Sequence, residues 1–269
     1  MKDKIVIITG ASSGIGRACA IAFANAGCKV VIAARDELKL QEVHLLVAEK
    51  GTEVLSVTTD VSREEDCKKL IEATLNRFGR IDILINNAGL SMRALFLDTD
   101  LKVLKHLMDV NFWGTVYCTK YALPHLLKTK GSIVGISSIA GKKGLPGRTG
   151  YSASKFAMEG FLETVRTENI ENGLHVLVAC PGYTASNIRN AALMKDGMPQ
   201  GESPLEETKL MTAEQVATEI LSAVIQRRRD LILTKQGKLM VFLNKFFPTF
   251  MDKMVYNHVA KEAGSPLKD

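Results

Sequence analysis

Short runs rich in β-branched residues alternate along the chain with amphipathic helical patterns, and this alternation restricts the fold more than any other feature. Near-continuous apolar runs are typical of strands buried on both faces, and helices between such strands indicate a parallel sheet. We predict seven strands, at Lys4–Thr9, Lys29–Ala34, Val54–Thr59, Ile81–Asn86, Ser132–Ser137, His175–Cys180 and Leu231–Thr234. Because crossovers between parallel strands are right-handed, we expect an α/β, doubly wound sheet with helices on both faces.

Two helix starts are predicted from paired residues. Ser62 with Glu65, and Thr212 with Gln215, have the spacing of a capping box. In that motif the first side chain accepts a backbone hydrogen bond and the second returns one, so both positions predict where a helix begins.

The 269 residues are expected to form a single domain, because one large α/β sheet can absorb this length and no repeat or linker divides the chain. Residues 1–235 are assigned to that α/β domain and 236–269 to an apolar, helical C-terminal extension. A loop at about 183–211, rich in Asn, Gly, Met and Pro, interrupts the pattern. Loops of this length in compact domains are usually functional.

The net charge of +6 does not indicate a nucleic-acid partner, because basic and acidic residues are interleaved along the chain. The dense cluster Arg227–Arg229 is interpreted as a solvated helix end. Neither the five cysteines nor the five histidines have the spacing of metal ligands, so we expect no metal site. The cysteines are interpreted as buried, reduced thiols, and with no signal-peptide pattern they predict a cytoplasmic protein.

A glycine-rich turn joins the first predicted strand to the first predicted helix. It contains Gly10, Ser12, Ser13, Gly14, Ile15 and Gly16. Glycines allow a tight turn and a close approach of backbone to a ligand, and free N–H groups at a helix N-terminus favour an anion. This turn therefore predicts a site for the pyrophosphate of a nucleotide.

The spacing of these glycines, G-x-x-x-G-x-G, resembles that of the short-chain dehydrogenase/reductase family, and further markers of that family follow in order. They are Asn87-Ala88-Gly89, Asn111, Ser138, Tyr151-x-x-x-Lys155 and Pro181-Gly182. The resemblance covers about residues 4–235 and implies a Rossmann fold and oxidoreductase activity. Any one of these motifs occurs often by chance, but their joint order is specific.

Tyr151 and Lys155 are four residues apart, so on a helix they share one face, and Ser138 follows a strand nearby in the sheet. A tyrosine with a pKa of about 10 is a poor acid–base catalyst near neutrality, and a lysine ammonium beside it is expected to lower that pKa. The hypothesis is that Tyr151 gives its proton to a carbonyl oxygen that also accepts a hydrogen bond from Ser138. The resemblance implies that Lys155 also binds the nicotinamide ribose, and that Asn111 supports a water that returns the proton.

The cofactor is predicted from the end of the second strand, where an acidic residue would select NAD. Here Ala34 and Arg35 stand at that position, and the resemblance implies that Arg35 pairs with the 2′-phosphate of NADP(H), with help from Arg17. Asp36 is the alternative, an acid that would select NAD(H), although we interpret it as a helix N-cap.

Further cofactor contacts are implied by the resemblance. Asp60 and Val61 match the adenine contact, and Pro181-Gly182 shape the backbone over the nicotinamide. Ser186 stands where the family usually has threonine.

The substrate is expected to be a small-molecule carbonyl or alcohol with a lipophilic body. The predicted pocket wall is apolar and consists of Leu90, Leu145, Tyr183, Ile188, Leu193, Met194 and Met198.

The tail after Lys238 is too interrupted by charges to cross a bilayer. Two interpretations remain for it: an amphipathic hairpin or helix pair that covers the pocket or a neighbouring subunit, and an interfacial membrane anchor. The resemblance also implies a homodimer or homotetramer, formed by the long helices around Leu101–Leu127 and Ser152–Asn172.

Three other functions were weighed. A 3-oxoacyl-carrier-protein reductase shares the motifs, but the apolar tail argues against it. A non-catalytic, NADP(H)-sensing scaffold would not need the complete set of Ser138, Tyr151 and Lys155, and a methyltransferase would leave Tyr151 and Lys155 unexplained.

Overall fold

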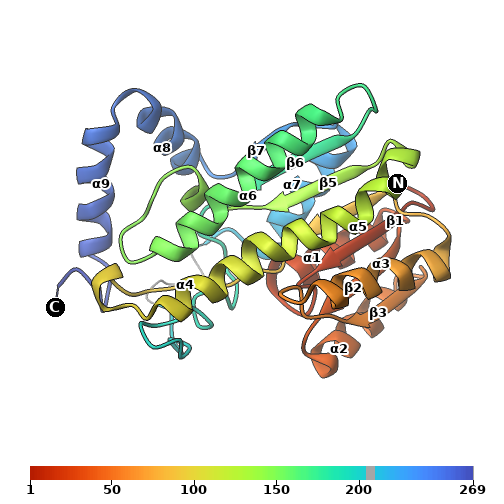
Figure 1. Ribbon diagram of the computed structural model, residues 1–269, viewed down its shortest axis with the longest axis horizontal. Helices are drawn as coiled ribbons and strands as arrows, with labels where there is room; N and C mark the ends of the chain where they lie inside the picture. The colour runs from red at the N-terminus through yellow and green to blue at the C-terminus, as the bar shows by residue number, and fades with distance from the viewer. Residues whose placement is uncertain (204–209, 269) are drawn as a thin grey trace.

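The computed structural model describes residues 1–203 and 210–268, and a seven-stranded parallel sheet lies at its centre (Figure 1). The strands are β1 (Ile5–Thr9), β2 (Lys29–Ala34), β3 (Val54–Thr58), β4 (Ile83–Asn86), β5 (Ser132–Ile136), β6 (His175–Cys180) and β7 (Asp230–Ile232). Their order is β3-β2-β1-β4-β5-β6-β7, so the direction of winding reverses between β1 and β4. This is the predicted doubly wound fold, in one domain, and such a reversal opens a crevice at the carboxyl ends of the strands.

Helices cover both faces of the sheet. One face packs against α1 (Gly14–Asn25), α2 (Glu37–Ala48) and α7 (Ala213–Ile225). The other packs against α3 (Glu64–Phe78), α5 (Gly114–Thr129) and α6 (Thr149–Glu168). Nearly every side chain of β1, β2, β4, β5 and β6 is buried, which explains the near-continuous apolar runs in the sequence, whereas the edge strands β3 and β7 are partly exposed.

The run before α5 is not a uniform α-helix. It begins as α4 (Leu101–Met108) and passes through a π-helical turn at Asp109–Trp113 before α5 continues. Asn111 lies within this turn and is fully buried. Such turns are frequent at functional sites because they redirect side chains.

One of the two predicted capping boxes is confirmed. Thr212 caps α7 by accepting from the Gln215 amide at 3.2 Å, and the Gln215 side chain accepts from the Thr212 amide at 2.9 Å. The prediction at Ser62 is wrong, because α3 starts one residue later, with Arg63 as its N-cap. The Ser62 hydroxyl donates instead to Asp60, at 2.7 Å.

The C-terminal extension forms a pair of helices, α8 (Lys235–Phe246) and α9 (Pro248–Ala260), at the end of the molecule opposite β2 and β3 (Figure 1). Met251, Val255 and Val259 are the buried residues of α9, and they pack against Met240 and Leu243 of α8. Within the described parts of the chain, no helix has both the length and the apolar character needed to cross a membrane.

Thr234 shows why β7 ends earlier than predicted. Its φ of 66° turns the backbone out of the strand, and its side chain caps α8 by accepting from the Gly237 amide at 3.0 Å. The predicted loop at 183–211 forms only isolated bridges, such as Thr184 with Met211, in its described part. Its residues 204–209 lie outside the described residues.

Candidate active site

A cavity of about 900 Å³ lies at the carboxyl ends of the strands, where the winding of the sheet reverses. This volume suits a dinucleotide cofactor together with part of a substrate. The predicted residues that line it are Gly10, Ser12, Ser13, Gly14, Ile15, Arg35, Asp60, Val61, Asn87, Ala88, Gly89, Leu90, Ser138, Leu145, Tyr151, Lys155, Pro181, Gly182, Tyr183, Ser186 and Ile188. Segments far apart in the sequence thus meet at one site.

Gly16 and Asn111 do not line the cavity but support residues that do. A Cβ atom on Gly16 would overlap the carbonyl oxygen of Gly10 and the side-chain Nδ2 of Asn87. The Asn87 side chain donates to the carbonyls of Thr9, at 2.9 Å, and Gly10, at 3.1 Å. The glycine turn is therefore held against the segment after β4, and no larger residue fits at Gly16.

The buried Asn111 side chain connects this segment to α6. Its Oδ1 accepts from the Leu90 amide at 2.8 Å, and its Nδ2 donates to the Leu90 carbonyl at 2.9 Å and to Ser154 Oγ at 2.8 Å. Ser154 in turn donates to the Tyr151 carbonyl at 2.8 Å. These bonds satisfy a buried amide and fix Leu90 relative to the first turn of α6.

The structure brings Tyr151, Lys155 and Ser138 together, but it does not show the expected lowering of the Tyr151 pKa. Burial raises the pKa of Tyr151 above 10.0, although a hydrogen bond to the Ser138 side chain and the charge of Arg148 oppose this. The Lys155 ammonium lies 5.8 Å from the centre of the Tyr151 ring and donates to the Ile136 carbonyl at 2.8 Å. For Tyr151, desolvation therefore outweighs the hydrogen bond to Ser138 and the charge of Arg148.

The pKa of Lys155 is also shifted. Burial lowers its pKa from 10.5 to about 8, and the negative charge of Glu159 acts against this shift. Glu159 lies one turn further along α6, where it accepts a hydrogen bond from Ser137 Oγ and pairs with Lys142 at 2.6 Å. A partly buried, charged network that the sequence did not indicate thus lies beside Lys155.

At the opposite end of the cavity, three charged residues follow β2. Arg35 and Lys39 both line the cavity and are exposed. Burial acts to raise the pKa of Asp60, but hydrogen bonds from Ser62 and, to a smaller extent, the charge of Arg35 lower it. Asp36 is the N-cap of α2, as interpreted from the sequence: it accepts from the Lys39 amide at 3.1 Å and pairs with Lys39 Nζ at 3.4 Å. Arg17, which the resemblance placed beside Arg35, does not line the cavity, whereas Lys39 does.

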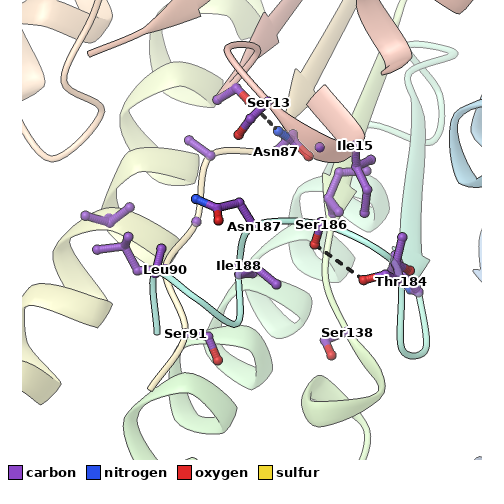
Figure 2. Close-up of a pocket in the computed structure, with 18 of the residues that line it drawn as sticks. Ser13, Ile15, Asn87, Leu90, Ser91, Ser138, Thr184, Ser186, Asn187 and Ile188 are labelled. Carbon is purple, nitrogen blue, oxygen red and sulfur yellow. Dashed lines mark hydrogen bonds between the residues drawn. The ribbon is translucent and has the colours of Figure 1, made fainter. Parts of the chain in front are cut away.

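The segment 184–188 crosses the cavity between the glycine turn, with Ser13 and Ile15, and the region of Ser138 (Figure 2). Ser186 lies against the turn, because a Cβ atom on Gly14 would be 3.3 Å from the Ser186 Cβ. The dashed line between Ser186 and Thr184 in Figure 2 marks the 3.5 Å hydrogen bond from Ser186 Oγ to the Thr184 carbonyl. This position is consistent with the contact that the resemblance implies for Ser186.

The substrate end is less apolar than expected. Leu90, Leu145 and Ile188 line it as predicted, whereas Met194 and Met198 point away and are 42% and 63% exposed. Leu193 also lies outside the lining; it packs against a buried cluster that includes Tyr151. Polar and charged residues that sequence reasoning missed take part instead: Ser91, Arg148, Asn187 and Arg189.

The C-terminal extension contacts Tyr183, which lines the cavity. The Tyr183 hydroxyl donates to Glu262 at 3.2 Å, and its ring stacks with that of His258. Glu262 also pairs with the buried Arg93 at 3.2 Å. The side chain predicted as a wall is thus held in place by residues that follow α8.

Comparison with known proteins agrees with this geometry. The family model for short chain dehydrogenases matches residues 4–196, and the chain belongs to this family of oxidoreductases. It is 35% identical to dehydrogenase/reductase SDR family member 7B of Danio rerio, over 98% of this chain and 88% of that protein. It is 33% identical to 11-beta-hydroxysteroid dehydrogenase A of Sesamum indicum, over 99% of this chain and 78% of that protein.

Two solved structures resemble the fold closely. A short-chain dehydrogenase/reductase of Burkholderia phymatum in complex with NAD has a TM-score of 0.82 at 26% identity, covering 91% of this chain and 93% of that one. An alcohol dehydrogenase of Thermococcus sibiricus complexed with 5-hydroxy-NADP has a TM-score of 0.75 at 26% identity, covering 86% and 96%. The fold therefore accommodates a nicotinamide cofactor of either type.

Proposed function

We propose that the protein is an NADP(H)-dependent carbonyl reductase or alcohol dehydrogenase in which Tyr151 is the general acid and base. The observation that carries this proposal is the convergence of Ser138, Tyr151 and Lys155 in one cavity with the glycine turn. Bound there, the nicotinamide supplies or accepts the hydride. Reduction of a carbonyl requires the protonated phenol, and the Lys155 ammonium in the same cavity favours the loss of its proton.

Each of the three side chains has a distinct task in this proposal. Tyr151 donates its proton to the oxygen of the substrate carbonyl, and Ser138 donates a hydrogen bond to the same oxygen. The Lys155 ammonium stabilises the tyrosinate that remains after transfer. Asn111 acts as a positioning residue, because its two ends hold Leu90 and Ser154 rather than reaching into the cavity.

The residues around the cavity fit a dinucleotide. The glycine turn leaves no room for a side chain at Gly16, which brings backbone N–H groups to the cavity edge. For the phosphate that distinguishes NADP(H), we propose Arg35 and Lys39 as the binding pair, with Ala34 in place of a repelling acid. Asp36 is already engaged by Lys39, so it offers less to the ribose hydroxyls of NAD(H).

For the substrate we propose a lipophilic ketone or alcohol. Leu90, Leu145 and Ile188 supply apolar walls, while Arg148 and Ser91 supply donors at one side. The relative whose name includes hydroxysteroid dehydrogenase supports the choice of a steroid-like or similarly apolar compound.

We also propose a cytoplasmic, homo-oligomeric enzyme. Five buried free thiols support the location, and the exposed aromatic residues Trp113 and Phe156 in the predicted contact helices support the assembly.

A substrate panel tests these proposals together. Ketones and alcohols of increasing apolar size are assayed with NADPH and NADH in parallel. We expect the largest kcat/KM for apolar ketones with NADPH. Equal activity with the two cofactors would overturn the NADP(H) preference, and no turnover across the panel would overturn the enzymatic function.

A further inference from the structure

Each of the two C-terminal helices has a second apolar face that the protein does not use. The inner face of α9 buries Met251, Val255 and Val259 against Met240 and Leu243 of α8 and against Leu145. The outer faces expose Leu239 (57%), Phe242 (60%), Phe246 (57%), Phe247 (58%), Phe250 (58%) and Met254 (41%). A helix pair that only covered its own domain would need the inner faces alone, so the outer surface requires another explanation.

The outer residues form one patch around the junction of α8 and α9. Leu239, Phe242 and Phe246 are three and four positions apart, which places them on one stripe of α8. The rings of Phe242 and Phe246 lie 5.2 Å apart. Phe247 and Phe250 continue the patch across the junction into α9. We call these residues, with Met254, the outer patch.

Positive charges surround the outer patch. The segment 235–261 contains five exposed lysines, Lys235, Lys238, Lys245, Lys253 and Lys261, and a single acid, Asp252, which pairs with Lys143. Among residues 1–203 and 210–268, none of these five lysines forms an ion pair. Exposed phenylalanines between unpaired lysines are typical of a surface that inserts into the headgroup region of an anionic bilayer.

We propose that the outer patch docks this protein onto an anionic lipid surface. A second copy of the chain is a poorer partner, because a two-fold interface would bring two sets of unpaired lysines together. Lipid headgroups neutralise the same lysines while the aromatic rings enter the acyl boundary. Leu145 lines the cavity and also packs against the buried cluster of α9, so this surface lies beside the substrate end of the site.

Vesicle flotation of the full-length protein tests the proposal without reference to enzymatic activity. The probes are vesicles of phosphatidylcholine alone and of phosphatidylcholine with phosphatidylglycerol. We expect binding to the mixed vesicles only, with each of Lys238→Gln, Lys245→Gln and Lys253→Gln weakening it by about fivefold. The triple variant Phe242→Ser, Phe246→Ser and Phe250→Ser is expected to abolish it, because all three rings are already exposed and the fold does not depend on them.

The matched control is Leu38→Ser with Leu45→Ser on α2, two exposed leucines of the domain at the opposite end of the molecule. It should bind vesicles as the wild type does. The proposal is overturned if the wild type ignores mixed vesicles or if the triple variant floats with them. It is also overturned if, in sedimentation without lipid, the triple variant converts a dimer to a monomer, since a second copy would then cover the patch. Reductase activity on a water-soluble ketone, measured alongside, tests the proposed function separately.

Discussion

The charged and titratable residues at the two ends of the cavity differ in how deeply they are buried. At the catalytic end, Tyr151 and Lys155 are buried, and desolvation changes both of their pKa values. At the end near β2, the side chains of Arg35 and Lys39 are exposed to solvent. In the proposed function, proton transfer takes place where burial shifts the pKa values, and selection of the cofactor takes place where exposed charges act.

Replacement of Tyr151 by phenylalanine tests the buried end with the largest expected effect. The change removes the proton donor but keeps the ring in its packed position, so we expect kcat to fall by about 10²–10⁴-fold. NADPH oxidation with a good ketone substrate measures the loss. Tyr256→Phe, at a half-exposed tyrosine of α9, is the control and should leave turnover unchanged. A Tyr151→Phe enzyme with normal turnover would refute the assignment.

Gly16→Ala tests the turn that lies between the two ends. The added methyl group would overlap Gly10 and Asn87, so we expect the free energy of unfolding to fall by about 1–3 kcal/mol, together with weaker NADPH binding. Urea denaturation and fluorescence titration measure the two effects. Gly160→Ala is the matched control, because a Cβ atom there meets nothing within 4 Å, and its helical position should make it neutral or slightly stabilising. Equal behaviour of the two variants would contradict the close packing of the turn.

Arg35→Ala tests the exposed end. If the guanidinium binds the 2′-phosphate, its loss should raise the KM for NADPH roughly tenfold, because a hydrogen bond to a charged group contributes about 1.5 kcal/mol. The KM for NADH should change little, and added salt should shrink the difference. Arg17→Ala, a basic residue near the turn but outside the cavity, serves as the control. A parallel loss with both cofactors would show that Arg35 acts on stability rather than on selection.

Glu159→Gln is expected to give the smallest effect, and it tests whether the charges of Glu159 and Lys155 are coupled. The pKa of Lys155 is about 8, so the ammonium is present below that pH and is lost as the pH rises through it. Without the negative charge of Glu159 the pKa falls further, and the alkaline limb of kcat/KM should move to lower pH. Glu163→Gln, on the exposed surface of the same helix, should leave the profile in place. An unmoved limb in Glu159→Gln would show that the two charges are independent.

Local sequence patterns predicted the elements of the fold but not every boundary. The capping boxes illustrate this difference: the Thr212 hydroxyl accepts from the Gln215 amide as predicted, whereas the Ser62 hydroxyl donates to the nearby Asp60. The π-helical turn at Asn111 has no pattern of its own, because its stabilising bonds reach to Leu90 and Ser154. Both cases depend on contacts that only the folded chain creates.

The site residues were predictable where sequence motifs fix the backbone, and less so where the conformation of a loop determines which side chains face the cavity. The glycine turn and the residues after β2 to β6 line the cavity as expected, because the carboxyl ends of parallel strands meet at one edge. Met194 and Met198 were placed in the wall from their apolar character, yet the loop turns them outward. The raised pKa of Tyr151 was missed because burial, unlike helical spacing, is a property of the whole fold.

The central claim is that this cavity moves a hydride between a nicotinamide and a carbonyl carbon while Tyr151 supplies the proton. The most direct test uses NADPH labelled with deuterium at the transferable position and the best ketone of the panel, with the product alcohol examined by mass spectrometry. We expect a single deuterium on the carbinol carbon with the wild type and almost no product with Tyr151→Phe. An unlabelled alcohol, or labelled product formed equally well by Tyr151→Phe, would contradict the account.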